Sequence, residues 1–185
     1  MTRSKLRWLG AVVALLGSMC AEAADPRPTL VQLEARLGRI GSPHIEGYEK
    51  MGGKAVPVLF FGNRKMNGNY DLVDTVRKDF GAVATIFVKD GDEFVRVSTN
   101  VMTQEGRRAV GTALARNMAY DAVSRGKTYC GVIDVLGTTF DSCYHPINDS
   151  AGKLIAVTYV GLKNSAQPGP SFLAPSNGSK RGVSE

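Results

Sequence analysis

Arg96 is the residue whose type and position most directly indicate binding chemistry. It stands in a β-forming run at 94–99, where a lone charge is costly unless it is paired or faces an open site. A hairpin turn at Asp90–Gly91 would join this run to the run at 84–88. With that turn, alternation along the strands places the following side chains on one face: Thr85, Phe87, Phe94, Arg96 and Ser98.

This predicted face suits a small anion. A guanidinium holds both oxygens of a carboxylate at once, and neighbouring hydroxyls add further donors. Arg96 and Ser98 are therefore candidate ligand-binding residues. The alternative is that Arg96 pairs with Glu93 or Asp92 at the surface, and the residues alone do not decide between the two.

A second predicted hairpin could form the floor of a pocket. If Leu136–Gly137 is a two-residue turn, Tyr129 lies opposite Tyr144 and Gly131 opposite Ser142, all on one face. Two tyrosines that frame a small residue and a serine can line a binding site. The alternative is that the tyrosines are core residues whose hydroxyls reach water.

The same register places Cys130 opposite Cys143. The two cysteines would occupy a non-hydrogen-bonded position with Cα atoms ~4.5 Å apart, within the ~4.4–6.8 Å of a disulfide. A bridge is therefore predicted, worth roughly 3 kcal/mol for a loop of this size; two free buried thiols are the alternative. No metal site is expected, because His44 and His145 are the only histidines and do not complete a set of four ligands.

The common signatures of enzymes are missing from the sequence. It has no Gly-x-Ser-x-Gly elbow, no phosphate-binding loop, no His-Glu-x-x-His and no Cys-x-x-Cys. No Ser, His and acid fall in a recognisable catalytic arrangement. We therefore expect neither an enzymatic activity nor a cofactor.

The elements that must position these residues indicate an α+β fold. Apolar residues at helical spacing predict a long N-terminal helix over 24–50, weakened near its end by Gly38 and Gly41. Two shorter helices are predicted, one at 70–80 between a capping Asn69 and Gly81, and one at 117–125. The predicted strands are the hairpins at 84–99 and 129–144 and a last strand at 154–161. Five antiparallel strands with helices that do not alternate with them argue against a doubly wound parallel sheet.

The two ends of the sequence predict export and a tail. A basic start with Arg3, Lys5 and Arg7 precedes an uncharged run at 8–19 and a small-x-small pattern that ends at Ala23. The run is too short for a bilayer, which needs ~20 apolar residues. We expect a cleaved signal peptide at 1–23, a periplasmic domain at 24–162 and a disordered tail at 163–185, rich in Ser, Gly and Pro. The formal net charge of +6 falls to +4 once Arg3, Lys5, Arg7 and Glu22 leave with the signal peptide, and that small, evenly spread charge does not indicate nucleic-acid binding.

Several short motifs, taken in order along the chain, resemble the Cache superfamily. They lie at 67–74, 84–88, 95–101, 107–112, 129–131, 135–137, 144–147 and 159–161. The chain is most similar to the single-Cache, Cache 3/Cache 2 fusion type, from about residue 52 to 161. The resemblance implies a PAS-like fold, in which a long N-terminal helix packs on a five-stranded antiparallel sheet and the other face of the sheet forms a ligand pocket.

The resemblance also implies a ligand class. Related modules bind small organic anions, often carboxylates. Arg96 aligns with their anion-binding arginine, Ser98 and Thr99 with polar contacts, and Tyr144 with an aromatic residue of the pocket. Ser142 stands where those relatives carry a second arginine, which favours a smaller or less charged ligand.

We therefore expect a stand-alone periplasmic Cache domain that binds a small organic anion through Arg96, with Ser98, Tyr129 and Tyr144 orienting it. Receptors of this family carry membrane helices and an output domain, so the expected partner is a separate membrane chemoreceptor, sensor kinase or transporter. The N-terminal helix allows a homodimer. The alternative is a ligand-free periplasmic scaffold or protein-interaction module with a filled core.

Overall fold

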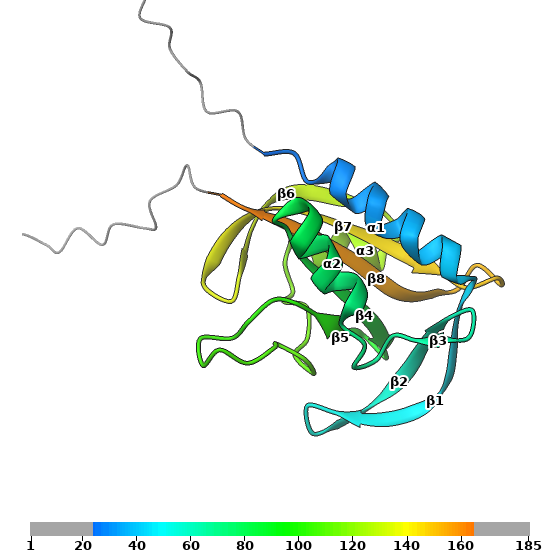
Figure 1. Ribbon diagram of the computed structural model, residues 1–185. Coiled ribbons are helices and arrows are strands. Elements are labelled where there is room, and N and C mark those ends of the chain that lie inside the picture. The colour runs from blue at the N-terminus through cyan, green and yellow to red at the C-terminus, as the bar shows by residue number, and fades with distance from the viewer. Residues whose placement is uncertain (1–23, 165–185) are drawn as a thin grey trace, which may run out of the picture.

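The computed structural model describes residues 24–164, which form three helices and eight strands (Figure 1). In chain order the elements are α1 (Arg27–Ile40), β1 (Pro43–Met51), β2 (Lys54–Phe61), β3 (Arg64–Lys65), α2 (Asp71–Phe80), β4 (Val83–Asp90), β5 (Glu93–Thr99), α3 (Met118–Ser124), β6 (Tyr129–Val135), β7 (Thr138–Asn148) and β8 (Leu154–Lys163). The expected signal peptide at 1–23 and the expected tail beyond residue 164 lie outside the described residues. Lys163, predicted as the first residue of the tail, is the last residue of β8.

Five of the strands form a central antiparallel sheet in the order β5-β4-β8-β7-β6. The first three strands form a separate antiparallel sheet, β1-β2-β3, which the sequence did not predict. Neighbouring strands are antiparallel throughout, and no helix crosses between parallel strands. The predicted α+β class is therefore confirmed.

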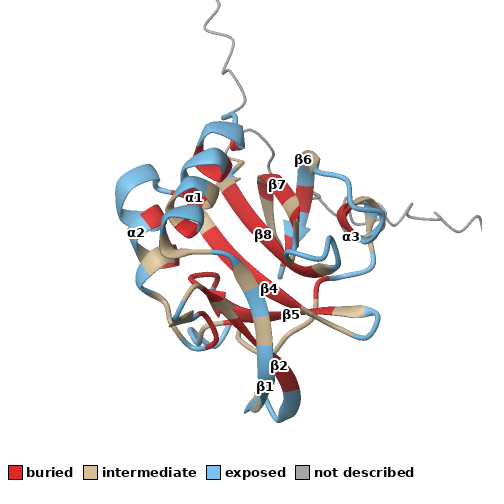
Figure 2. Cartoon of the chain, turned by 90° about the vertical axis from the view of Figure 1, so that its right-hand side faces the viewer, coloured by how far each residue is buried: buried red, intermediate tan, exposed pale blue. Residues whose placement is uncertain are grey.

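The central sheet is covered on both faces (Figure 2). On one face, α1 and α2 bury a first core cluster that includes Leu33, Leu37, Val73 and Val76. On the other face, α3 and the loop at 100–117 bury a second cluster, in which they contribute Val101, Ala109, Leu114, Ala119 and Val123. The sheet thus separates a helix-packed face from a face closed by one short helix and a loop.

The predicted helix at 24–50 is wrong over its second half. α1 ends at Ile40, and β1 begins at Pro43. Gly41 has φ 145°, outside the helical region, and a Cβ on it would lie 2.6 Å from the Gly62 Cα atom. Proline cannot continue a helix and disfavours helical backbone in the residue before it. The N-terminal helix is therefore 14 residues long, and the rest of the predicted helix is strand.

The two shorter helices begin and end close to their predicted bounds. Gly81 ends α2 in the left-handed conformation at φ 65°, which glycine adopts without steric cost. Tyr70 takes the N-cap position of α2, while the Asn69 side chain accepts the Asp71 N–H at 3.2 Å. Asn117 caps α3 by accepting two backbone N–H groups, at 3.0 and 3.1 Å.

The hairpin of β6 and β7 has the predicted register. Leu136 and Gly137 both have positive φ, at 54° and 86°, as a type I′ turn requires. Tyr129 therefore pairs with Tyr144. Cys130 and Cys143 form the predicted disulfide, with Cα atoms 4.2 Å apart.

The hairpin of β4 and β5 turns one residue later than predicted. Asp90 pairs with Glu93, so the turn residues are Gly91 and Asp92. Gly91, at φ 56°, stands at the first central position, where type II′ turns favour glycine. This moves the pairing by two residues, which leaves each side chain on its predicted face as far as Arg96.

Candidate ligand-binding site

One face of the central sheet gathers most of the predicted binding residues. Arg96 on β5 lies over the Phe87 ring on β4, which belongs to the core cluster under α3 and the loop at 100–117. Phe94 belongs to the same cluster. The side chains of the opposite face, against α1 and α2, include Ile86, Val95 and Val97. The predicted division of this hairpin between two faces is confirmed for these residues.

Arg96 is 4% exposed and is held by one segment of the loop, 111–113. Its Nη1 donates to Thr112 Oγ1 at 2.7 Å and to the Ala113 carbonyl at 3.2 Å. Its backbone N–H donates to the Thr112 carbonyl at 2.9 Å, and its carbonyl accepts the Gly111 N–H at 2.8 Å. The guanidinium carbon lies 5.0 Å from the centre of the Phe87 ring, a cation–π distance.

The charge of Arg96 has no carboxylate partner within residues 24–164. The alternative of a surface ion pair with Glu93 or Asp92 is wrong, because Arg96 is buried and Glu93 pairs with Lys54 at 3.2 Å. The Arg96 Nε atom is buried without a hydrogen-bond partner among these residues. Burial lowers the pKa of Arg96, and the nearby Tyr144 and Tyr159 side chains oppose that shift. A buried charge without a counter-charge is costly, so an anion bound here would stabilise the folded state.

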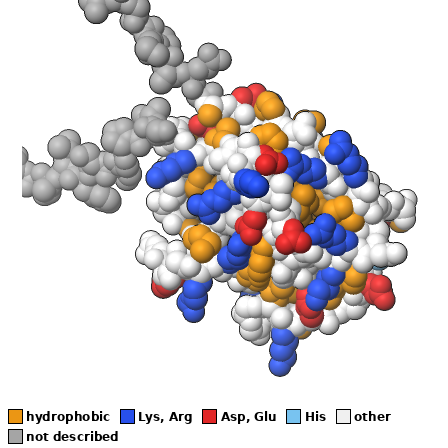
Figure 3. All heavy atoms as spheres, in the orientation of Figure 1, with side chains coloured by type: hydrophobic (Ala, Val, Ile, Leu, Met, Phe, Trp, Pro, Cys, Tyr) orange, Lys and Arg blue, Asp and Glu red, His pale blue; other side chains and the backbone are white. Residues whose placement is uncertain are grey.

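Unlike Arg96, several charged side chains at the described surface lie close to charges of opposite sign. On the face shown in Figure 3, basic and acidic side chains alternate over the surface. Several form ion pairs, among them Arg36 with Asp79 at 2.7 Å and Lys65 with Glu49 at 2.9 Å. The unpaired and buried Arg96 stands out against this background as a charge that the described fold does not neutralise.

A row of hydroxyl side chains crosses all five strands next to Arg96. The strand register places these residues opposite one another in the order β6, β7, β8, β4 and β5: Tyr129, Tyr144, Tyr159, Thr85 and Thr99. The ring centroids of Tyr144 and Tyr159 are 4.6 Å apart. The hydroxyl oxygens of Thr85 and Thr99 are 2.6 Å apart and share a hydrogen bond. The face therefore combines one guanidinium with hydroxyl groups from every strand of the sheet.

Burial keeps the hydroxyls of two of these tyrosines protonated. Tyr144 and Tyr159 are each 1% exposed. Burial raises the pKa of both above the ordinary value of 10.0, and the charge of Arg96 opposes the rise. A protonated hydroxyl can donate to a carboxylate or carbonyl oxygen.

The Tyr159 hydroxyl has no hydrogen-bond partner in the described chain. Ser142 lies close enough to lower the pKa of Tyr159, but the two hydroxyls do not meet hydrogen-bond geometry. Ser142 instead donates to the Phe140 carbonyl at 3.3 Å. Two orphaned polar atoms, Tyr159 Oη and Arg96 Nε, thus belong to the same face of the sheet.

A row of small residues leaves room for the tyrosine hydroxyls. Gly131, Ser142 and Gly161 lie opposite one another on β6, β7 and β8, next to the tyrosine row. A Cβ on Gly131 would lie 2.7 Å from Tyr129 Oη, and a Cβ on Gly161 would collide with the Tyr159 hydroxyl. The structure therefore brings Gly131 and Ser142 beside the tyrosines, as the hairpin register predicted.

Ser98 faces the opposite side of the sheet, which corrects the prediction. The pairing of β4 with β5 shifts after Arg96 and leaves Val97 as a bulged residue. A bulge adds one residue and reverses the alternation beyond it. Ser98 Oγ accordingly donates to the Asn69 carbonyl at 2.5 Å, beside α2. Thr99 occupies the place on the Arg96 face that was predicted for Ser98.

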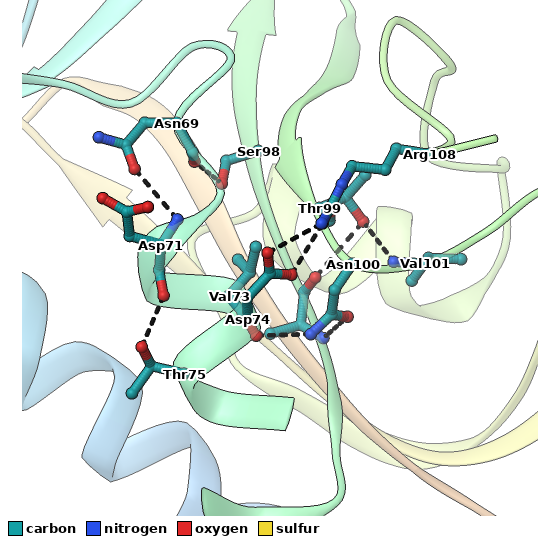
Figure 4. A network of polar contacts seen from close by, with 11 residues as sticks. Asn69, Asp71, Val73, Asp74, Thr75, Ser98, Thr99, Asn100, Val101 and Arg108 are labelled. Carbon is teal, nitrogen blue, oxygen red and sulfur yellow. Dashed lines mark hydrogen bonds and ion pairs between the residues drawn. The ribbon is translucent and has the colours of Figure 1, made fainter. Parts of the chain in front are cut away.

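Arg108 fastens the loop at 100–117 to α2 (Figure 4). Its two terminal nitrogens donate to the two carboxylate oxygens of Asp74, each at 2.8 Å, and Nη1 also donates to the Thr99 carbonyl at 2.8 Å. Its guanidinium carbon lies 4.4 Å from the centre of the Tyr70 ring. A bidentate pair fixes geometry as well as charge. The loop that holds Arg96 is thus anchored where β5 ends.

The Arg96 site is enclosed. Three grooves of the described surface lie elsewhere: about 200 Å³ beside the disulfide and the start of α1, about 780 Å³ beside β3 and the start of α2, and about 390 Å³ between α1 and β7. Arg96, Tyr144 and Tyr159 line none of them. Arg96 is 4% exposed and Tyr144 and Tyr159 are each 1% exposed, so this face is closed to solvent in the structure.

Sequence reasoning placed Thr85 on the Arg96 face but missed two residues of this site, Tyr159 and Thr112. Tyr159 lies in a motif that carries the family resemblance, and the register of β8 against β7 would have placed it beside Tyr144. The loop between these strands leaves that register open in the sequence. Thr112 lies in an irregular loop, where no periodicity signals its contact with Arg96. Among the described residues, no cluster of three or more His, Cys, Asp or Glu side chains could hold a metal ion.

This arrangement, a buried arginine and a hydroxyl row on the covered face of an antiparallel sheet, agrees with a comparison against protein families. The family model of the Cache 3/Cache 2 fusion domain matches residues 44–168, more than half of the chain. The chain belongs to this family. Cache domains are extracytoplasmic sensory modules that bind small ligands and work with membrane sensor partners, rather than catalysts. No curated protein matches the chain. None of the described helices is long and apolar enough to cross a membrane.

Proposed function

We propose that this Cache domain binds a small organic anion with a single carboxylate, held by Arg96, and reports its presence to a separate membrane partner. The observation that carries the proposal is the buried guanidinium of Arg96 without any carboxylate partner in residues 24–164. A fold retains such a charge at a cost in stability. Binding of an anion to Arg96 would explain why the fold keeps this destabilising charge.

The hydrogen bonds of Arg96 indicate how the carboxylate binds. Nη1 is occupied by Thr112 and Ala113. The opposite edge of the guanidinium, Nε with Nη2, makes no hydrogen bond to the described residues. That edge presents two parallel donors, the geometry that a carboxylate accepts with both oxygens.

The remaining side chains of the site limit the charge of the ligand. Ser142 supplies a hydroxyl where relatives are expected to carry a second arginine, so one carboxylate is matched and a second is not. Tyr144, Tyr159 and Tyr129 offer hydroxyl groups for a hydroxy or keto oxygen, whereas the Thr99 hydroxyl is engaged by Thr85 Oγ1 and by the Val101 N–H. A short monocarboxylate with one further oxygen fits this set best.

The domain is proposed to act in the periplasm after cleavage of residues 1–23, with a chemoreceptor, sensor kinase or transporter as its partner. Membership of an extracytoplasmic sensory family supports this proposal. A homodimer through α1 is compatible with it, since Val31 on that helix is 58% exposed.

The test is a thermal-shift screen of residues 24–164 against acetate, lactate, pyruvate, succinate and citrate, with acetamide and lactamide as neutral controls. A ligand that binds only the folded state raises the melting temperature. We expect lactate or pyruvate to raise it and the amides not to. The shift should vanish in Arg96→Ala and persist in Arg107→Ala, which removes an exposed arginine from the same loop. A shift of equal size in Arg96→Ala contradicts the assignment of Arg96.

The enclosure of the site favours one rival function. Because Arg96, Tyr144 and Tyr159 are almost fully buried, the same geometry suits a filled core in a ligand-free protein-interaction module. No shift with any compound of the screen, together with capture of a partner protein by ligand-free domain, would support that rival.

A further inference from the structure

The β1–β2 hairpin is held at both ends by close contacts between pairs of glycines. Its tip, at Gly52, meets Gly111 of the loop at 100–117. Its base meets the end of α1, where Gly62 lies against Gly41. In Figure 1 the hairpin lies below α1.

At the tip, the backbones of Gly52 and Gly111 touch. A Cβ on Gly52 would lie 2.7 Å from the Gly111 Cα atom, and a Cβ on Gly111 would lie 2.5 Å from the Gly52 Cα atom. Real Cβ atoms essentially never approach other atoms within 3.0 Å. Both positions therefore need glycine for space as well as for their positive φ angles of 57° and 80°.

The tip contact is one residue away from the groups that hold Arg96. Gly111 donates its N–H to the Arg96 carbonyl at 2.8 Å. The next residue, Thr112, accepts from the Arg96 guanidinium at 2.7 Å and from its N–H at 2.9 Å. Only backbone atoms lie between Gly52 and this set of bonds, so no flexible side chain can absorb a displacement.

The contact at the base joins the hairpin to α1 in the same way. A Cβ on Gly41 would lie 2.6 Å from the Gly62 Cα atom, and a Cβ on Gly62 would lie 2.5 Å from the Ile40 carbonyl oxygen. Gly62 also donates its N–H to the Ser42 carbonyl at 3.0 Å. Between the two ends, β1 and β2 are paired from Pro43↔Phe61 to Met51↔Lys54, with one irregularity between Ile45 and Tyr48.

We propose that Gly52 is a positioning residue for Arg96, and that the β1–β2 hairpin couples the occupancy of the Arg96 site to the C-terminal end of α1. An anion that moves Thr112 as it binds Arg96 must also move Gly111, and Gly111 cannot move toward the hairpin without displacing Gly52. The paired strands carry that displacement to Gly62 and the end of α1. That the ligand at Arg96 is an anion rests on the proposed function, whereas the contact between Gly52 and Gly111 does not.

The chain supplies a matched control for this proposal. Gly53, next to Gly52, also has a positive φ, 85°, but a Cβ on it would meet nothing within 4 Å. Alanine at either position carries the backbone cost of positive φ, and only Gly52→Ala adds a collision with Gly111. Any effect of G52A beyond that of G53A is therefore due to the contact.

The first measurement is made on ligand-free protein. We would record the 1H–15N resonances of the Arg96 Nε–H and of the Thr112 and Gly62 amides in wild type, G52A and G53A. The expected result is a shift of all three resonances in folded G52A and none in folded G53A. Unchanged resonances in G52A, or equal shifts in both variants, would overturn the proposal.

If G52A does not fold, Arg96→Lys replaces it and tests the coupling from the other end. Its Gly52 and Gly62 amides should shift, while those of Arg107→Lys, a change on an exposed side chain of the same loop, should not. Unshifted Gly52 and Gly62 amides in R96K would overturn the proposal as well.

The second measurement is a titration of wild type, G52A and G53A with sodium lactate. We expect G52A to weaken the affinity by between about twofold and thirtyfold, the range for mutations that act along a coupling network, and G53A to leave it unchanged. If lactate does not bind wild type, the proposed function fails for this anion, while the ligand-free spectra still decide the coupling. Equal affinities in G52A and G53A contradict the role of Gly52 as a positioning residue.

Discussion

Reduction of the disulfide should destabilise the domain by an amount that the structure sets. Cys130 and Cys143 are 13 residues apart, and for a loop of this size the chain-entropy model gives about 3 kcal/mol at 25 °C. The β6–β7 hairpin pairs from Tyr129 to Val135 on either side of the bridge, so the folded geometry does not depend on the covalent link. The loss therefore comes from the greater freedom of the unfolded chain.

In a domain of this size each kcal/mol changes the melting temperature by roughly 3–4 °C. The melting temperature should thus fall by about 10 °C when the protein is refolded under reducing conditions. Cys143 is fully buried in the core cluster under α1, so the double variant C130A/C143A also loses sulfur packing. It should be somewhat less stable than reduced wild type and should not respond to the reductant.

The assay is thermal unfolding of both proteins with and without reductant, together with a thiol titration of untreated wild type. Two titrating thiols, or a melting temperature of wild type that the reductant leaves unchanged, would refute the reasoning. A response of C130A/C143A to the reductant would show that the effect has another source.

Two further predictions concern the surroundings of the site. Arg108→Ala should lower the free energy of unfolding by about 1 kcal/mol, because it breaks a half-exposed bidentate pair with Asp74. Arg64→Ala, which removes an ion pair to the 80% exposed Asp71, should lower the free energy of unfolding clearly less. Equal losses for the two variants in urea unfolding would contradict the anchoring role of Arg108. Tyr144 and Tyr159 have raised pKa values in the folded state, so folding favours their protonated form. The stability that these two phenols contribute is complete below pH ~10, the pKa of tyrosine in the unfolded chain, and it declines as the pH rises above that value. An ultraviolet titration should show both phenols ionising only as the protein unfolds, and ionisation of all six tyrosines near pH 10 in folded protein would contradict their burial.

Local patterns in the sequence predicted the parts of the site that depend on neighbouring residues. The Leu136–Gly137 turn fixes the register of β6 and β7, and with it the disulfide and the position of Tyr144 opposite Tyr129. Strand alternation placed Arg96 and Phe87 on one face even though the turn was predicted one residue early. Moving the turn by one residue changes the pairing of the strands by two residues, which leaves each side chain on the same face of the sheet.

The parts that depend on contacts between distant segments could not be predicted. The bulge at Val97 is visible only in the pairing of β5 with β4, and it moves Ser98 off the Arg96 face. No residue of β1 is buried, and five of its nine residues are exposed, so its sequence lacks the apolar alternation that would have distinguished it from a continued helix. Thr112 reaches Arg96 from a loop without periodicity.

The central claim, that Arg96 is a buried charge kept for an anion, is tested most directly by the free energy of unfolding of wild type and Arg96→Met. Methionine fills a similar space without the charge, and replacing even a paired set of buried charges by apolar residues is often neutral or stabilising by about 1–4 kcal/mol. We predict that without anion R96M is at least as stable as wild type, and that saturating lactate stabilises wild type alone. An R96M variant that is several kcal/mol less stable without anion, or that lactate stabilises as much as wild type, would contradict the account.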